Sequence, residues 1–158
     1  MTDSGIDVRR YALRLLSYRG RSENELRDRL LRKGFSEETV SLTLAYLKES
    51  GFIDDRVLAV DLKRQAVEQK KLGYRAARSL LQRRGVSDDL AESTLVYDEE
   101  VELANARSLL DKKHGPAGNY LAPKERKRLY DYLSRRGFSS YVIGRVFRDF
   151  QTEDGEKG

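Results

Sequence analysis

The sequence contains no cysteine, and only one histidine and two prolines among its 158 residues. Without cysteine, the chain can form no disulfide, no thiolate metal site and no cysteine nucleophile. The single histidine, His114, also excludes a metal site built from several histidines. No apolar run approaches the length that crosses a bilayer, and the N-terminus carries no signal-peptide pattern. We therefore expect a cytoplasmic protein without membrane segments.

Motifs typical of enzymes are also missing. Neither the phosphate-binding pattern G-x-x-x-x-G-K-[ST] nor the dinucleotide pattern G-x-G-x-x-G occurs. Adjacent acidic residues lie where helices are expected to begin, a position that the helix dipole explains without catalysis. These pairs are Asp54-Asp55, Asp88-Asp89 and Glu99-Glu100. We predict that the protein is not an enzyme and that it binds no cofactor and no metal.

The abundant residues favour helices that enclose several small cores. Leu, Arg, Glu, Lys and Ala are good helix formers and are frequent in the chain. Charged residues make up 36% of the sequence and hydrophobic residues 39%, a hydrophobic share that is low for one large core. No stretch alternates with period two for long enough to indicate a strand.

An internal repeat is the strongest signal in the sequence. Three segments align without gaps, and they are Leu26–Leu44, Ala77–Leu95 and Leu129–Phe147. Each contains one glycine at the same place, Gly34, Gly85 or Gly137, and these glycines lie 51 and 52 residues apart. Apolar residues four and eight positions before each glycine share one helix face. The glycine suits a left-handed helix end, and the serine two residues later suits the start of the next helix.

Another amphipathic segment precedes each of these pairs, so each repeat is expected to contain three helices. We expect the first helix of the second repeat to run from about Val57 to Lys71, and that of the third from about Glu99 to Lys113. The predicted fold is all-α, with three tandem three-helix repeats in an elongated, curved array. The predicted bounds are 1–55, 56–98 and 99–150, followed by a disordered tail at 151–158.

Positive charge is concentrated in the second and third repeats. Residues 63–84 contain eight basic residues and only one acidic residue, a net charge of +7. From this segment we predict a partner-binding or nucleic-acid-binding role for Lys63, Arg64, Lys70, Lys71, Arg75, Arg78, Arg83 and Arg84. From a second basic cluster in the third repeat we predict the same role for Lys124, Lys127, Arg128, Arg135 and Arg136.

The repeated basic pairs also have a structural explanation, which stays open at this point. The last turn of an expected helix contains each of the pairs Arg32-Lys33, Arg83-Arg84 and Arg135-Arg136, and there the helix dipole stabilises cations.

Three of the tyrosines, Tyr11, Tyr46 and Tyr74, lie on or beside the apolar stripes and are expected to pack in part against the core, whereas Tyr120 is expected to be exposed.

Several runs of residues match the order and spacing of motifs in a known family. In the first repeat they are Gly34-Phe35 through Leu47, then Gly51-Phe52-Ile53-Asp54-Asp55 and Ala59. In the second they are Lys71-Leu72-Gly73-Tyr74 and Arg83-Arg84-Gly85-Val86. In the third they are Ala104 through His114-Gly115, then Leu133-Ser134-Arg135-Arg136-Gly137-Phe138 and Ile143. Over about residues 8 to 150 the chain resembles the RecX family of regulatory proteins. It departs from the family where Val101-Glu102 occupies the region of a frequent tryptophan.

The resemblance implies a modulator, usually an inhibitor, of the recombinase RecA. It implies that the protein lies in the groove of the RecA–DNA filament and limits filament growth, strand exchange, ATP hydrolysis and co-protease activity. The expected partners are the RecA filament and single- and double-stranded DNA, bound by a monomer. In this hypothesis repeats 2 and 3 supply the electrostatic contact, and repeat 1 contributes shape and apolar contacts.

Two other functions fit the same sequence. The chain could be a helical DNA-binding protein that acts directly on DNA, since three-helix units resemble helix-turn-helix modules in outline. Against this, the helices expected to read the bases begin with the acidic pairs Glu37-Glu38 and Asp88-Asp89. The chain could also be a scaffold for a protein other than RecA.

Overall fold

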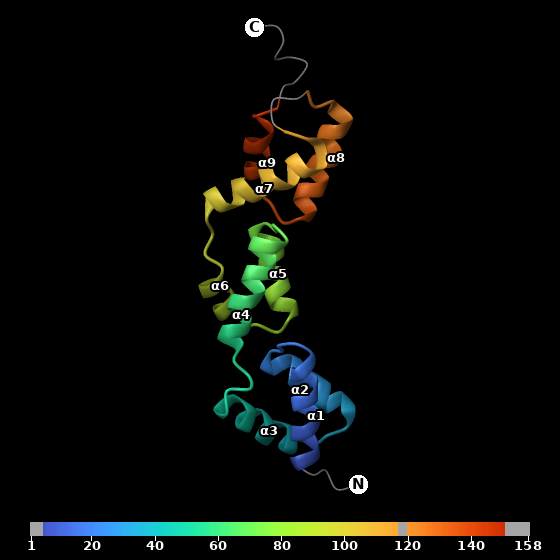
Figure 1. The fold of residues 1–158 in the computed structure, drawn as a ribbon, viewed down its shortest axis with the longest axis vertical. Coiled ribbons are helices and arrows are strands. Elements are labelled where there is room, and N and C mark those ends of the chain that lie inside the picture. The colour runs from blue at the N-terminus through green and yellow to red at the C-terminus, as the bar shows by residue number, and fades with distance from the viewer. Residues whose placement is uncertain (1–4, 117–119, 151–158) are drawn as a thin grey trace. The chain divides into compact units, whose positions relative to one another are not determined.

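The computed structural model describes residues 5–116 and 120–150, and these residues form nine α-helices, one π-helical segment and no β-strand (Figure 1). The all-α prediction is therefore confirmed. The chain divides into two compact units: Met1–Leu62 with Leu81–Thr94, and Lys63–Leu80 with Leu95–Gly158. The predicted tail at 151–158 lies outside the described residues. Within the described ranges, no helix is both long enough and apolar enough to span a membrane.

In the first unit, helices α1 (Gly5–Tyr18), α2 (Glu23–Lys33) and α3 (Glu37–Glu49) pack against one another. Their shared core consists of Val8, Ala12, Leu15, Leu26, Leu30, Val40, Leu44, Leu47 and Ile53. Ser22 and Glu25 form a capping box at the start of α2, so the Ser22 hydroxyl satisfies one of the otherwise unpaired N–H groups of that helix. Ser36 caps α3 in the same way, which confirms the predicted helix starts.

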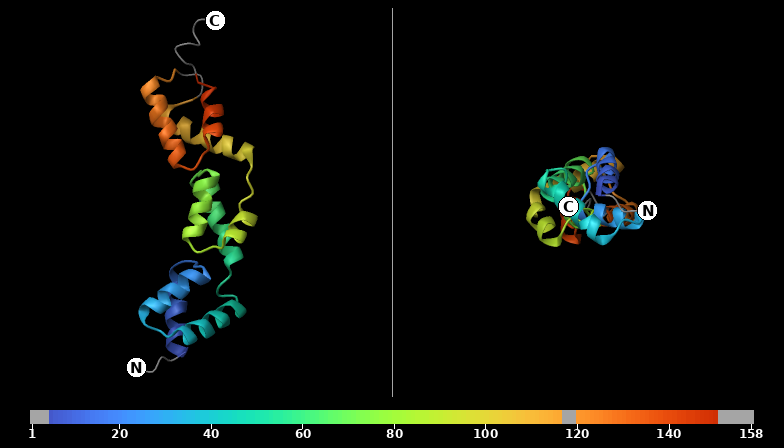
Figure 2. Two further views of the ribbon diagram at one scale, coloured as in Figure 1. Left: turned by 180° about the vertical axis from the view of Figure 1, so that it is seen from behind. Right: turned by 90° about the horizontal axis from the view of Figure 1, so that it is seen from below.

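In the second unit, helices α7 (Glu99–His114), α8 (Pro123–Arg135) and α9 (Ser140–Phe147) form another three-helix core. The three helices lie side by side both in Figure 1 and in the reverse view at the left of Figure 2. Their core contains Leu103, Ala106, Leu109, Leu110, Leu121, Leu129, Leu133, Phe138, Val142, Ile143, Val146, Phe147 and Phe150. The first helix of the third repeat, α7, thus begins at the predicted Glu99 and ends one residue after the predicted Lys113.

The middle repeat contains α4 (Asp55–Lys63), the π-helical segment η1 (Arg64–Gln69), α5 (Tyr74–Arg83) and α6 (Asp88–Thr94). We predicted one α-helix from about Val57 to Lys71, and this prediction is wrong in its second half. There the helix widens, and the Lys70 N–H donates to the Gln65 carbonyl, five residues back, at 2.9 Å. The carbonyl of Val67 instead accepts from the buried Asn105 amide of α7 at 3.0 Å. This tertiary contact accounts for the change, because it satisfies a carbonyl at a helix end.

The three repeat glycines all adopt the predicted left-handed conformation, with φ angles of 106° at Gly34, 80° at Gly85 and 97° at Gly137. They differ in their surroundings. A Cβ atom built on Gly85 would overlap the Ser22 hydroxyl, and one on Gly137 would lie 2.5 Å from the Ala76 main-chain nitrogen. A Cβ on Gly34 would meet nothing within 4 Å.

Gly85 and Gly137 therefore mark two equivalent joints between repeats, one in each unit. In the first joint the end of α5 meets the start of α2, and the Asn24 side chain donates to the Gly85 carbonyl at 3.3 Å. In the second, the end of α8 meets the start of α5, and the Gly73 N–H donates to the Arg136 carbonyl at 2.8 Å. Since glycine has no Cβ, it permits this close backbone approach.

Candidate partner-binding surfaces

Two of the predicted binding lysines, Lys70 and Lys71, lie in a hollow of about 540 Å³ in the second unit. The other basic residues that line it are Lys112, Lys113 and Arg136. We call these five cations and the space between them the basic hollow. Its remaining lining residues are Gln69, Ser108, Leu109 and Tyr132, so no acidic side chain lines it. A concave surface with cations alone is suited to an anionic partner.

Three separate elements bring the five cations together. The π-helical segment ends immediately before Lys70, and Lys71 follows with a left-handed backbone, φ 57°. Lys112 and Lys113 occupy the last turn of α7, where the helix dipole favours cations. Arg136 is the C-cap residue of α8. The three elements are far apart in sequence, so the basic hollow is a product of tertiary structure.

Arg136 anchors the basic hollow in the fold. Its guanidinium donates to the Lys70 carbonyl, and its main-chain carbonyl accepts from Gly73. Its Nε atom is buried and has no hydrogen-bond partner within the described ranges. Beside it, Lys113 lies over the Tyr132 ring, with Nζ 4.6 Å from the ring centroid. Arg136 therefore has a structural role as well as a place in the hollow.

Lys112 and Lys113 are not among the binding residues predicted from the sequence. They lie outside the three aligned segments, directly before His114 at the end of a helix. The available signal was the adjacent basic pair itself, which resembles the pairs of the aligned segments. Sequence spacing gives no sign that this pair faces Lys70 and Lys71.

Arg84 is held within the fold of the first unit. Its Nε lies 3.2 Å from Glu25 Oε2, and its Nη2 donates to the Gly20 carbonyl at 2.9 Å. The neighbouring Arg83 is exposed. In the pairs Arg83-Arg84 and Arg135-Arg136, the second arginine, which directly precedes the glycine, therefore contributes to a joint between repeats. A partner contact through Arg84 stays a prediction.

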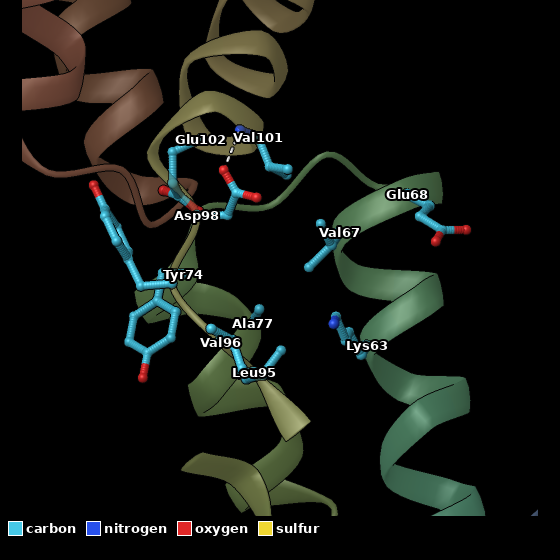
Figure 3. A pocket seen from close by; sticks show the side chains of 11 residues that line it. Lys63, Val67, Glu68, Tyr74, Ala77, Leu95, Val96, Asp98, Val101 and Glu102 are labelled. Atoms are coloured by element: carbon cyan, nitrogen blue, oxygen red, sulfur yellow. Dashed lines mark hydrogen bonds between the residues drawn. The ribbon is translucent and has the colours of Figure 1, made fainter. Parts of the chain in front are cut away.

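Lys63 lines a different space in the second unit, which we call the apolar hollow (Figure 3). The hollow measures about 380 Å³ and is lined by four charged residues, Lys63, Glu68, Asp98 and Glu102, and by seven apolar or aromatic residues from η1, α5, the segment before α7 and α7 itself. These seven are Val67, Tyr74, Ala77, Leu95, Val96, Tyr97 and Val101. The Arg78 guanidinium lies 3.5 Å from the Tyr74 hydroxyl. The structure thus separates Lys63 from the basic hollow.

Glu102 is the buried acid of the apolar hollow, with 6% of its surface exposed. Burial raises the pKa of its carboxyl, and a hydrogen bond from the Tyr74 main-chain N–H opposes part of that rise. Glu102 and Val101 occupy the region where the resemblance led us to expect a tryptophan. In this region Glu102 is buried and Val101 is exposed.

The other predicted binding residues are exposed but do not line the basic hollow. They are Arg64, Arg75, Lys124, Lys127, Arg128 and Arg135.

The aromatic predictions are largely confirmed: Tyr11 and Tyr74 are partly buried, and Tyr120 is exposed. Tyr46 is more exposed than we expected, and the Arg9 guanidinium covers its ring at 3.8 Å.

Three-helix units that meet at tight glycine joints define a helical repeat protein. Comparison with known proteins gives the family. The family model of the first three-helix domain of RecX matches residues 9–47, and the family model of the third three-helix domain matches residues 100–147. The chain belongs to the RecX family of regulatory proteins.

Individual relatives support the same assignment. The regulatory protein RecX of Amycolatopsis mediterranei is 32% identical over 142 residues, which cover 89% of this chain and 81% of the relative. That of Halorhodospira halophila is 36% identical over 152 residues, 96% of this chain and 92% of the relative. The crystal structure of RecX from Lactobacillus salivarius has a TM-score of 0.77 at 21% identity, covering 94% of this chain and 97% of that one. At that identity the structure supports the fold alone.

Proposed function

We propose that this protein is a cytoplasmic, monomeric regulator that binds the groove of the RecA–DNA filament and inhibits the recombinase, ATPase and co-protease activities of RecA. Membership of the RecX family supports a regulatory role. The repeats that we delimit as 1–55, 56–98 and 99–150 would offer several separate contacts to a repeating partner. Linked contacts that are individually weak add up through their effective concentration.

The observation that carries the electrostatic part of this proposal is the basic hollow. Five cations line it without an acidic residue, and their mutual repulsion is relieved when an anionic partner enters. In the filament that partner is either an acidic RecA surface or the DNA backbone. The protein itself supplies binding energy and needs no catalytic group or cofactor for this role.

The test is the ATPase activity of RecA on single-stranded DNA, measured with increasing substoichiometric amounts of this protein. We expect ATP hydrolysis to fall with dose, because a regulator bound in the groove acts on more than one RecA subunit. ATP hydrolysis that stays constant over a wide range of doses contradicts the proposal.

A second candidate function is direct action on DNA, and the absence of acids from the lining of the basic hollow favours it. This alternative requires tight binding to naked DNA at moderate salt, with an affinity that falls steeply as salt rises. Fluorescence anisotropy with labelled single-stranded and duplex oligonucleotides measures both. Weak binding to naked DNA, together with strong inhibition of RecA, rules the alternative out.

A further inference from the structure

The first unit contains a hollow lined by four arginines, although its repeat carries no net charge in the sequence. The hollow measures about 460 Å³ and lies between the segment that follows α1 and one face of α2. Its lining residues are Arg19, Arg21, Glu25, Asp28, Arg29 and Arg32. We call it the arginine hollow. The last four share one helix face, since they occupy positions i, i+3, i+4 and i+7 of α2.

Arg21 is unusual among these residues because only 8% of its surface is exposed. Its Nε donates to the Leu15 carbonyl at 3.3 Å, which fixes the guanidinium at the end of α1. The two terminal nitrogens have no acceptor among residues 5–116 and 120–150, although Arg21 lines the hollow. Burial and the charges of Arg19 and Arg29 lower the pKa of Arg21. A buried, fixed cation with unused donors is a prepared site for an oxyanion.

The acids of the arginine hollow leave an excess of positive charge. Glu25 accepts from the Ser22 main-chain N–H and forms ion pairs with Arg19 and Arg84, both at 3.2 Å. Four arginines therefore face two acids in the lining. Glu25 is engaged by Arg19 and Arg84 and also acts on Arg21, and the exposed Asp28 is the other acid. None of Arg21, Arg29 and Arg32 has an ion pair in the described part of the chain.

The mixture of charges indicates which anion the site accepts. A nucleic acid strand presents a continuous row of phosphates, which Asp28 and Glu25 would repel. A single carboxylate from a protein can instead lie between the arginines and accept two parallel hydrogen bonds from a guanidinium fork. The basic hollow differs, because its lining contains four lysines and Arg136 and has no acidic residue that would repel a row of phosphates.

We propose that the arginine hollow binds a carboxylate side chain of an acidic protein segment, and that this segment belongs to the protein bound under the proposed function. The inference rests on that function for the identity of the partner, but not for the chemistry of the site. It gives the first repeat a charged contact, where the sequence indicated only shape and apolar contacts.

Hexaglutamate provides a direct probe that does not involve RecA. We would add hexaglutamate or hexathymidylate to the isotope-labelled full chain and follow the Nε–Hε signals of its arginines by NMR. We expect hexaglutamate to shift the signals of Arg21, Arg29 and Arg32 more than those of the other arginines. Larger shifts of these three signals with hexathymidylate would overturn the proposal, as would equal shifts at all arginines.

Two variants with equal charge changes complete the test. R29Q/R32Q removes two exposed cations of the arginine hollow, and R10Q/R14Q removes two exposed cations of α1 that do not line it. We expect R29Q/R32Q to weaken hexaglutamate binding about tenfold, in line with loss of charge-assisted contacts, and R10Q/R14Q to change it less than twofold. Equal effects of the two variants would contradict the site.

The affinity for DNA-free RecA separates this inference from the proposed function. If the wild-type protein binds hexaglutamate in the arginine hollow but does not bind RecA, the site stands and the proposed function fails. If R29Q/R32Q loses hexaglutamate but keeps full affinity for RecA, the partner assigned to the site is wrong. Loss of both affinities in R29Q/R32Q, with R10Q/R14Q unaffected, supports the whole inference.

Discussion

The guanidinium of Arg84 lies 3.2 Å from the carboxylate of Glu25, and this ion pair joins the end of α5 to the start of α2. Both side chains are largely buried, with 18% and 16% of their surfaces exposed. Glu25 also belongs to the capping box of α2. One carboxylate thus stabilises a helix start and a joint between repeats.

Replacing Arg84 with methionine should destabilise the protein by about 2 kcal/mol, because Glu25 then keeps only the more exposed Arg19 as a charged partner and the partly buried Gly20 carbonyl loses its donor. Urea denaturation measures this change. Arg83→Met is the matched control, since Arg83 is the exposed neighbour, and we expect it to change stability by less than about 0.5 kcal/mol. Equal effects of the two substitutions would show that the ion pair contributes nothing to the joint.

The three repeat glycines provide an internal comparison. Gly34→Ala should cost about 1 kcal/mol, because alanine tolerates a positive φ poorly and the site is otherwise open. Gly137→Ala should cost about 3 kcal/mol, because its Cβ also overlaps the backbone of Ala76. Thermal and urea unfolding of both variants give the difference. If Gly137→Ala is no more destabilising than Gly34→Ala, the second joint is looser than described.

Glu102 gives the stability of the protein a specific pH dependence. Since burial raises the pKa of its carboxyl in the folded state, the contribution of this group is most favourable below its unfolded pKa and is lost as the pH rises through the folded pKa. Glu102→Gln should therefore raise the melting temperature at pH 7.5, whereas the gain should shrink towards pH 4. A gain that stays constant over this range would show that the carboxyl does not titrate differently in the two states.

The basic hollow and the second basic cluster can be compared by charge reversal. K70E/K71E/K112E changes three residues of the hollow, and K124E/K127E/R128E changes three exposed residues of α8 that do not line it. We expect the first variant to lose most RecA inhibition and the second to keep most of it, with the circular dichroism of both unchanged. Equal losses would show that overall charge, and not the hollow, governs the effect.

The helices and their ends were largely predictable from the sequence because they depend on local interactions. Residues four apart share a helix face, and Gly34, Gly85 and Gly137 end helices through their own backbone freedom. Serine caps act within three residues. The repeat made these local signals unambiguous, since each occurs three times at a fixed spacing.

The candidate sites were predictable only in part because their residues come from distant segments. Lys70, Lys71 and Arg136 were predicted from the sequence as binding residues, but the position of Lys112 and Lys113 beside them depends on how α7 packs. The widening of the helix after Lys63 likewise depends on Asn105, 38 residues beyond the carbonyl of Val67 that it binds.

The array of three-helix units, and the residues at which the helices begin and end, could be read from the sequence, since periodicity and capping are short-range effects. The sequence did not show which of two adjacent arginines supports the fold, or which cations face a shared space. The burial and pairing of charges depend on residues that folding brings together from distant parts of the chain, so a local sequence pattern does not predict them.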